Sequence, residues 1–261
     1  HAEFVAVPKN LVVRIPEGVS FEDAAYTTLG AIAMQGFRQA EPVLGETVAV
    51  VGLGLLGQLT VQLLKSAGCR VVGMDINPDT FDYAKKFGCD LLLNAKNSPE
   101  IVNTVNSFTN GNGVDSVIIT ASTSSNEPTE LALNICRKRG KIVVVGAVGM
   151  NIPRSLFYTK EIDYRISCSY GPGRYDPFYE EYGQDYPFAY VRWTENRNMM
   201  AFLQLIADGK MDCRTLTTHT FPITDAVNAY NLITGKTNER YLGILLRYNE
   251  HSKPESTIKI K

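Results

Sequence analysis

A glycine-rich segment follows a short run of β-branched residues. The run Thr47–Val51 passes directly into Gly52-Leu53-Gly54-Leu55-Leu56-Gly57, and apolar residues at helical spacing come next. In such a strand–turn–helix context the first glycine permits the tight turn, the second lets a pyrophosphate approach the backbone, and the third lets helix and strand pack closely. The helix start supplies free amides and the positive end of its dipole. The spacing therefore predicts a dinucleotide pyrophosphate site at Gly52, Gly54, Leu55, Leu56 and Gly57.

An acidic residue ends the next β-branched run. Asp75 closes the segment Arg70–Asp75, 23 residues after Gly52, where a carboxylate accepts hydrogen bonds from the adenosine ribose hydroxyls. No arginine is among the four residues that follow, and a carboxylate repels a 2′-phosphate, so the sequence predicts NAD rather than NADP. Two alternatives stay open. In the first, Asp75 binds no ribose and only caps the turn before Asn77-Pro78. In the second, the whole segment belongs to a methyltransferase, which also has a glycine-rich first turn and a similarly placed acid.

Short β-branched runs alternate with amphipathic stretches over residues 47–169, which predicts an α/β fold with a doubly wound parallel sheet. We expect six strands, at Thr47–Val51, Arg70–Asp75, Leu91–Leu93, Val114–Thr120, Lys141–Val145 and Tyr164–Ser169. Helices are expected between them at Leu59–Ala67, Thr80–Phe87, Glu100–Phe108 and Glu130–Arg137.

The flanking segments have a different pattern. Upstream we expect two strands, Phe4–Val7 and Leu11–Ile15, and a helix that Ser20 caps. Downstream we expect a helix, a strand, a second helix and a last strand, at Asn198–Ala207, Leu216–Phe221, Thr224–Ile233 and Leu242–Leu246.

Composition excludes several classes of protein. The 26 basic and 27 acidic side chains give a net charge of -1, without the basic excess of a nucleic-acid binder. No apolar run approaches the roughly 20 residues of a membrane span. The five cysteines are widely spaced, as expected of free thiols in a reducing compartment, so we expect a cytoplasmic protein.

These segments together resemble the medium-chain dehydrogenase/reductase family of alcohol and threonine dehydrogenases. The resemblance is carried by Val5–Pro8, Ile15–Ala25, Val48–Gly57, Gly140–Gly146 and His219–Ile223. It implies a Rossmann sheet flanked by part of a GroES-like catalytic domain whose first, larger part is missing. The implied units are residues 1–28 (catalytic-domain remnant), 29–169 (NAD-binding domain), 170–248 (aromatic insertion and the rest of the catalytic part) and 249–261 (linker or tail). A narrower likeness, at Tyr26–Ala33 and Ser169–Pro177, is to a bacterial branch in which a Gfo/Idh-type oxidoreductase follows.

The resemblance implies an NAD-dependent oxidoreductase that moves a hydride between nicotinamide and a secondary alcohol or ketone, with a sugar or nucleotide sugar as a candidate substrate. The residues after the fourth, fifth and sixth strands should face the nicotinamide half: Ala121, Ser122, Gly146, Ala147, Val148, Ser167, Cys168 and Ser169. No catalytic acid or base can be assigned. The alternative is a non-catalytic dinucleotide-binding or assembly domain of a larger protein.

Zinc-dependent members take one ligand from a cysteine in the helix before the dinucleotide fold, where this chain has Thr27-Thr28-Leu29-Gly30. The three histidines, His1, His219 and His251, have no ligand spacing. We therefore expect no metal site, and we expect His219 to be a hydrogen-bonding residue at the end of a strand.

Two further expectations concern the segment after the fifth strand. Residues 170–194 contain six tyrosines, two phenylalanines and a tryptophan, which either line a substrate pocket or pack against a missing domain or a partner subunit. The lightly charged strand Tyr164–Ser169 lies at a sheet edge, so we expect it to pair with its copy in a homodimer.

Overall fold

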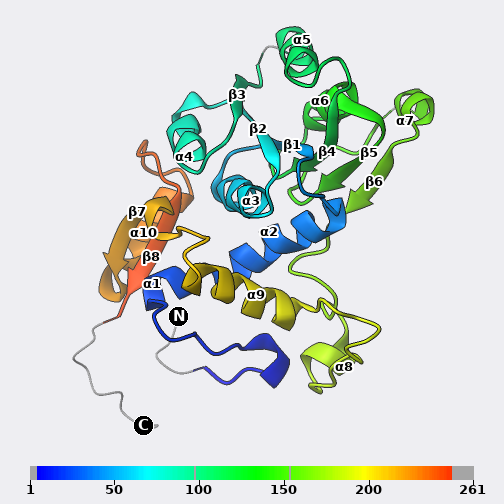
Figure 1. The fold of residues 1–261 in the computed structure, drawn as a ribbon. Coiled ribbons are helices and arrows are strands. Elements are labelled where there is room, and N and C mark those ends of the chain that lie inside the picture. The colour runs from blue at the N-terminus through cyan, green and yellow to red at the C-terminus, as the bar shows by residue number, and fades with distance from the viewer. Residues whose placement is uncertain (1–4, 97, 153, 249–261) are drawn as a thin grey trace, which may run out of the picture.

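The computed structural model describes residues 5–96, 98–152 and 154–248, and its centre is a six-stranded parallel sheet (Figure 1). The strand order is β3-β2-β1-β4-β5-β6, so the chain starts in the middle of the sheet and winds outward in both directions. The α/β doubly wound prediction is confirmed. The strands are β1 (Thr47–Val51), β2 (Arg70–Asp75), β3 (Leu91–Asn94), β4 (Val114–Ile119), β5 (Cys136–Val144) and β6 (Asp163–Ile166).

Helices cover both faces of the sheet. One face packs against α2 (Thr27–Ala40), α3 (Leu55–Ser66) and α4 (Phe81–Lys86). The other packs against α5 (Ser98–Phe108), α6 (Glu127–Ile135) and α7 (Arg154–Lys160). All five residues of β1 are buried, which explains why the central strands are continuous apolar runs rather than alternating ones.

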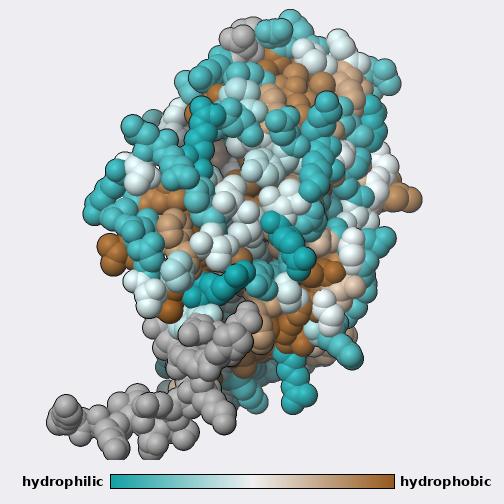
Figure 2. All heavy atoms as spheres, turned by 90° about the vertical axis from the view of Figure 1, so that its left-hand side faces the viewer, coloured by the Kyte–Doolittle hydropathy of each residue, from teal (hydrophilic) through white to brown (hydrophobic). Residues whose placement is uncertain are grey.

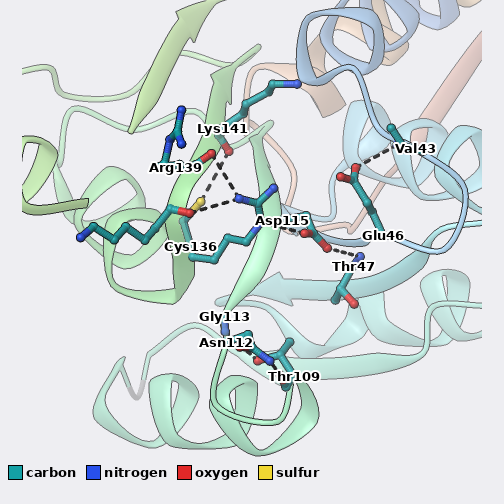
Figure 3. A network of polar contacts seen from close by, with 12 residues as sticks. Val43, Glu46, Thr47, Thr109, Asn112, Gly113, Asp115, Cys136, Arg139 and Lys141 are labelled. Atoms are coloured by element: carbon teal, nitrogen blue, oxygen red, sulfur yellow. Dashed lines mark hydrogen bonds and ion pairs between the residues drawn. The ribbon is translucent and has the colours of Figure 1, made fainter. Parts of the chain in front are cut away.

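A polar network holds the strands together at their amino ends, the edge of the sheet opposite the glycine-rich turn (Figure 3). Asp115, in β4, accepts hydrogen bonds from the backbone amide of Thr47 at 2.9 Å and from Nε of Arg137 at 2.8 Å. One carboxylate thus joins the starts of β1, β4 and β5. The network is structural. It lies at the amino ends of the strands, whereas ligands of open α/β sheets bind outside the carboxyl ends.

A second lobe lies beside the sheet (Figure 1). Its helix α9 (Glu195–Ala207) packs along α2, where the ring of Phe202 occupies the space that a side chain at Gly30 would need. The lobe also contains α1 (Phe21–Ala24), α8 (Pro177–Glu180), α10 (Ala226–Ile233) and the parallel pair β7 (Thr217–Pro222) and β8 (Gly243–Arg247). Four 3-10 turns complete the described elements, at Lys9–Leu11, Pro78–Thr80, Arg214–Leu216 and Ile223–Asp225.

The predicted amino-terminal strands are wrong for the described residues. The segment from Val5 to Ile15 contains the 3-10 turn Lys9–Leu11 and no strand, while Phe4 lies outside the described residues. The backbone there is tied by side chains instead: Asn196 donates through Nδ2 to the carbonyls of Asn10 and Val12, at 2.8 and 2.9 Å. A β-branched sequence forms a strand only where a neighbouring strand pairs with it, and no described strand does.

Two elements near the site have ends that differ from those expected from the sequence. Strand β6 ends at Ile166, so Ser167, Cys168 and Ser169 leave the sheet, and Ser169 has a φ of 47°. Helix α6 begins at Glu127 and ends at Ile135, earlier than the expected Glu130–Arg137. Pro128 in the first turn suits a helix start, and the earlier start brings Glu127 to the edge of the sheet.

Hydrophilic and hydrophobic residues are mixed on the face of the molecule drawn in Figure 2. The hydrophobic residues form separate patches there. Within the described ranges, no helix combines the length and apolar character needed to cross a membrane.

Candidate dinucleotide site

A pocket of about 170 Å³ opens at the carboxyl ends of β1, β2 and β4. Four of the predicted site residues line it together: Gly52, Asp75, Ala121 and Ser122. The remaining lining residues, which the sequence had not singled out, are Val51, Met74, Ile76, Ala95, Thr123, Ser125, Glu127, Pro128 and Leu131. Among the described residues that line the pocket, the charged side chains are those of Asp75 and Glu127, both carboxylates. This is the edge where open α/β sheets bind ligands.

The three glycines of the turn have different surroundings. Gly52 has a φ of 98°, a left-handed conformation that strains other residues. A side chain at Gly57 would overlap the carbonyl oxygen of Gly52, so α3 can approach β1 only if residue 57 is glycine. Gly54 is the N-cap of α3, and a Cβ built there meets no atom within 4 Å. The fold itself therefore requires Gly52 and Gly57, while Gly54 leaves space open at the helix start.

That open space is suited to an anion. The first amides of a helix have no acceptors within it, and here they belong to Leu55, Leu56 and Gly57. The N-cap Gly54 has no side chain to satisfy them. The hydroxyl of Thr120 donates to the carbonyl of Gly52 at 2.6 Å and fixes the turn from the neighbouring strand. The arrangement fits the pyrophosphate of a dinucleotide.

Both carboxylate oxygens of Asp75 accept a hydrogen bond from a backbone amide. Its Oδ2 accepts the amide of Leu53 at 2.6 Å, and its Oδ1 accepts the amide of Asn77 at 2.8 Å. The expected turn cap is therefore confirmed. A carboxylate has about four lone-pair sites, so these bonds leave capacity for ribose hydroxyls.

Of the residues expected near the nicotinamide, Ala121 and Ser122 line this pocket, whereas those that follow β5 and β6 do not. Gly146 packs so closely on the carbonyl of Ala121 that a side chain there would overlap it. Ala147 forms an isolated parallel bridge with Ser122, which continues the pairing of β4 and β5 beyond their ends. Val148 packs at the border of the core, Ser167 is buried, and Cys168 is exposed. The structure thus places Gly146 and Ala147 beside Ala121 and Ser122, and Ser167–Ser169 one strand further out.

Metal-ligand chemistry does not fit the part of the chain that the structure describes. No group of three or more His, Cys, Asp or Glu side chains there is arranged to hold a metal ion. At Thr27–Gly30, where zinc-dependent members have a cysteine ligand, the hydroxyl of Thr27 donates to the carbonyl of Ala24 at 2.6 Å. His219 shares hydrogen bonds with Thr218 and Glu239, both at 2.9 Å, which confirms its hydrogen-bonding role. It lies inside β7 rather than at the expected strand end, because the strand continues to Pro222. His1 and His251 lie outside the described residues.

The aromatic segment 170–194 is an ordered module that packs on α9 and α2 and contributes no lining residue to the pocket. Tyr179, only 1% exposed, stacks on Tyr186 with ring centroids 5.3 Å apart. Trp193 lies under the guanidinium of Arg38 at 3.3 Å and that of Arg192 at 3.7 Å. Burial and the charge of Arg192 lower the pKa of Arg38 to about 10.

A buried glutamate, Glu195, directly follows the aromatic segment 170–194 in the chain. Glu195, the first residue of α9, is 0% exposed, and its two carboxylate oxygens make no close hydrogen bond with a described residue. Burial, followed by the nearby Glu180 carboxylate, raises the pKa of Glu195 to about 7, while Arg174 and the hydroxyl of Tyr170 act in the opposite direction. A fully buried glutamate was not evident from the sequence because charged residues are rarely buried.

The chain is similar to known dehydrogenases. A family model described as zinc-binding dehydrogenase matches residues 56–182. The chain is 30% identical over 216 residues to an alcohol dehydrogenase of Rhizobium meliloti (strain 1021), covering 82% of this chain and 62% of the relative. It is 30% identical over 210 residues to a D-guloside 3-dehydrogenase of Escherichia coli (strain K12), covering 78% of this chain and 55% of that relative.

One solved structure shares the fold at a TM-score of 0.72 and 20% identity, over 91% of this chain and 63% of the other. It is a short chain alcohol dehydrogenase of Escherichia coli CFT073 complexed with the cofactor NADH. The chain spans about three fifths of the length of the relatives and structures it matches.

Proposed function

We propose that this chain, whose family-model match and relatives support the medium-chain dehydrogenase/reductase family, is the dinucleotide-binding part of an NAD-dependent oxidoreductase. The reaction would be hydride transfer between nicotinamide and a secondary alcohol or ketone. The observation that carries the proposal is Gly54, a helix N-cap that faces open space two residues after Gly52, which lines the same pocket as Asp75.

The chain's own residues would each hold one portion of the cofactor. The amides of Leu55, Leu56 and Gly57 would bind the pyrophosphate, and Asp75 would accept the adenosine ribose hydroxyls. The apolar side chains of Ile76 and Leu131 would cover the base. The bound nicotinamide ring would supply the hydride acceptor.

The nicotinamide half of the cofactor would lie against the carboxyl ends of the outer strands. Ala121, Ser122, Gly146, Ala147 and Val148 follow β4 and β5. Ser167, Cys168 and Ser169 follow β6. The buried hydroxyl of Ser167 has no hydrogen-bond partner among the described residues, which supports a ligand contact near this turn. We assign no catalytic acid or base.

The charges in the pocket favour NAD over NADP. Asp75 and Glu127 are both acidic, and no Lys or Arg among the described residues lines the pocket. An added 2′-phosphate would lie beside Asp75 without a cation to pair with it.

The substrate is proposed to be a small alcohol or ketone, and a sugar is compatible with the sugar-derivative dehydrogenase among the relatives. The second candidate function is a non-catalytic dinucleotide-binding or assembly domain. It is favoured by the absence, in the described part of the chain, of a side-chain group that could hold the metal named in the family description.

The proposal is tested by titrating the chain with NADH and following nicotinamide fluorescence. Gly54→Ala should weaken binding roughly tenfold, because the methyl group occupies the space of the pyrophosphate. Its thermal midpoint should stay close to that of the wild type, because the methyl group meets no protein atom. Unchanged NADH affinity in Gly54→Ala would contradict the proposal.

Gly57→Ala is the contrasting variant. Its methyl group overlaps the carbonyl of Gly52, so it should lower the free energy of unfolding by roughly 1–3 kcal/mol. Turnover of alcohols by the full-length gene product, compared with binding alone, separates the enzyme from the non-catalytic candidate.

A further inference from the structure

Two acidic side chains line the pocket, and they come from different elements. Asp75 ends β2, and Glu127 begins α6, on the chain that leaves β4. Ile76 and Ala95 contribute apolar surface after β2 and β3, and Pro128 and Leu131 contribute it from α6. The result is a slot with apolar surface and two carboxylates, and none of its lining residues within the described ranges is cationic.

Glu127 is held in position by its backbone. Its amide donates to the hydroxyl of Ser125 at 3.1 Å, and the amide of Ser125 donates to the hydroxyl of Thr123 at 3.2 Å. These bonds fix the loop before α6 and do not involve the Glu127 side chain. The carboxylate itself has no ion pair or hydrogen bond with another residue that the structure describes, so it is free to accept one from a ligand.

Asp75 and Glu127 line the same pocket from two different elements, so a nucleoside bound there would lie between them. With the ribose held at Asp75, the base extends into the apolar part of the slot and toward α6. Adenine carries one exocyclic amino group, which is a donor, and an ionised carboxylate is only an acceptor. We propose that Glu127 is a specificity-determining residue that accepts a hydrogen bond from the adenine 6-amino group. This inference rests on the dinucleotide site proposed above.

The role has a direct chemical consequence. In nicotinamide hypoxanthine dinucleotide an oxygen replaces the 6-amino group, so the carboxylate of Glu127 would face another acceptor and repel it. A glutamine at the same position can either accept from an amino group or donate to an oxygen. The wild type therefore discriminates between the two bases, and Glu127→Gln loses that discrimination.

Glu130 provides a matched control. It also belongs to the first turn of α6 and is exposed, but it does not line the pocket. Glu130→Gln makes the same change of charge at the same helix terminus. NADH and its hypoxanthine analogue have the same phosphates and the same nicotinamide, so long-range electrostatic effects cancel in the ratio of their dissociation constants.

The experiment measures both dissociation constants by nicotinamide fluorescence for the wild type, Glu127→Gln and Glu130→Gln. The wild type and Glu130→Gln should bind NADH roughly tenfold more tightly than the analogue, the scale of one hydrogen bond to a charged group. In Glu127→Gln the ratio should fall toward one. An unchanged ratio in Glu127→Gln, or an equal fall in Glu130→Gln, would overturn this inference alone. Failure of the wild type to bind either compound would overturn the proposed function and the inference with it.

Discussion

The carboxylate of Asp75 accepts the backbone amide of Leu53 at 2.6 Å and so ties the end of β2 to the glycine turn that follows β1. The same group accepts the amide of Asn77 at 2.8 Å. A residue expected to hold a ribose thus also shapes the loop beside it. The proposed ribose contact would therefore couple cofactor binding to stability at this position.

Replacement of Asp75 should therefore have two effects. Asp75→Ala leaves two amides without their acceptor and should lower the free energy of unfolding by roughly 1–2 kcal/mol. It should weaken NADH binding, while NADPH binding falls less or improves because the repulsive charge is removed. Denaturant unfolding and parallel titrations with both cofactors report the effects. An equal loss of affinity for the two cofactors would mean that Asp75 acts only through the fold.

The buried acid of α9 should make stability depend on pH. The pKa of Glu195 is raised from 4.5 to about 7, mainly by burial. Between these values the folded chain keeps a proton that the unfolded chain has lost, so this stabilising contribution is complete below pH 4.5 and is lost as the pH rises through 7.

Glu195→Gln stays uncharged and should be more stable than the wild type at pH 8, by roughly 1–2 kcal/mol after allowance for screening. The advantage should disappear at pH 4.5. Urea unfolding at both pH values measures it, and Glu181→Gln, an exposed neighbour of the same module, serves as the control. A difference that is the same at both pH values would contradict the assignment of a raised pKa.

The chain should purify without stoichiometric zinc. The described residues offer no cluster of metal ligands, and the position Thr27-Thr28 has hydroxyls where a cysteine ligand is expected. Elemental analysis after washing with a chelator checks this. About one zinc per chain after this wash would contradict the prediction.

Strand β6 should mediate a homodimer. It is the edge of the sheet, and Ile166 at its end is 56% exposed. An unpaired edge of this kind pairs readily with its copy across a two-fold axis. Light scattering at micromolar concentration should give the dimer mass for the wild type and a monomer for Ile166→Lys. Val227→Lys changes a similarly exposed apolar residue on α10 and should remain dimeric; a monomeric wild type would contradict the prediction.

The central strands of the sheet were predictable from the sequence because they are buried on both faces, as in β1. All six expected strands are present in the described residues. Runs such as Val48–Val51 are apolar throughout and are followed by turn residues. Helix α2 was not predicted from residue pattern. It contains buried glycine and alanine and packs against α3 and α9. The two interior glycines, Gly30 and Gly36, lower its intrinsic helix propensity and so weaken the helix signal in the sequence.

The candidate site was predictable only in part, for a similar reason. Gly52, Gly54, Gly57 and Asp75 have local spacing that identifies them. Glu127 has none, and only the early start of α6 brings it to the pocket. A rule that ligands bind outside the carboxyl ends of the strands points to the loop after β4, but the lining residues within that loop are determined by tertiary packing.

The most direct test of the account is a titration of the wild-type chain with NADH and with NADPH, followed by nicotinamide fluorescence and by energy transfer from Trp193, the single tryptophan. The account predicts saturable binding of NADH, with NADPH roughly tenfold or more weaker, because Asp75 and Glu127 leave a 2′-phosphate without a cationic partner. Absence of saturable NADH binding, or a preference for NADPH, would contradict it.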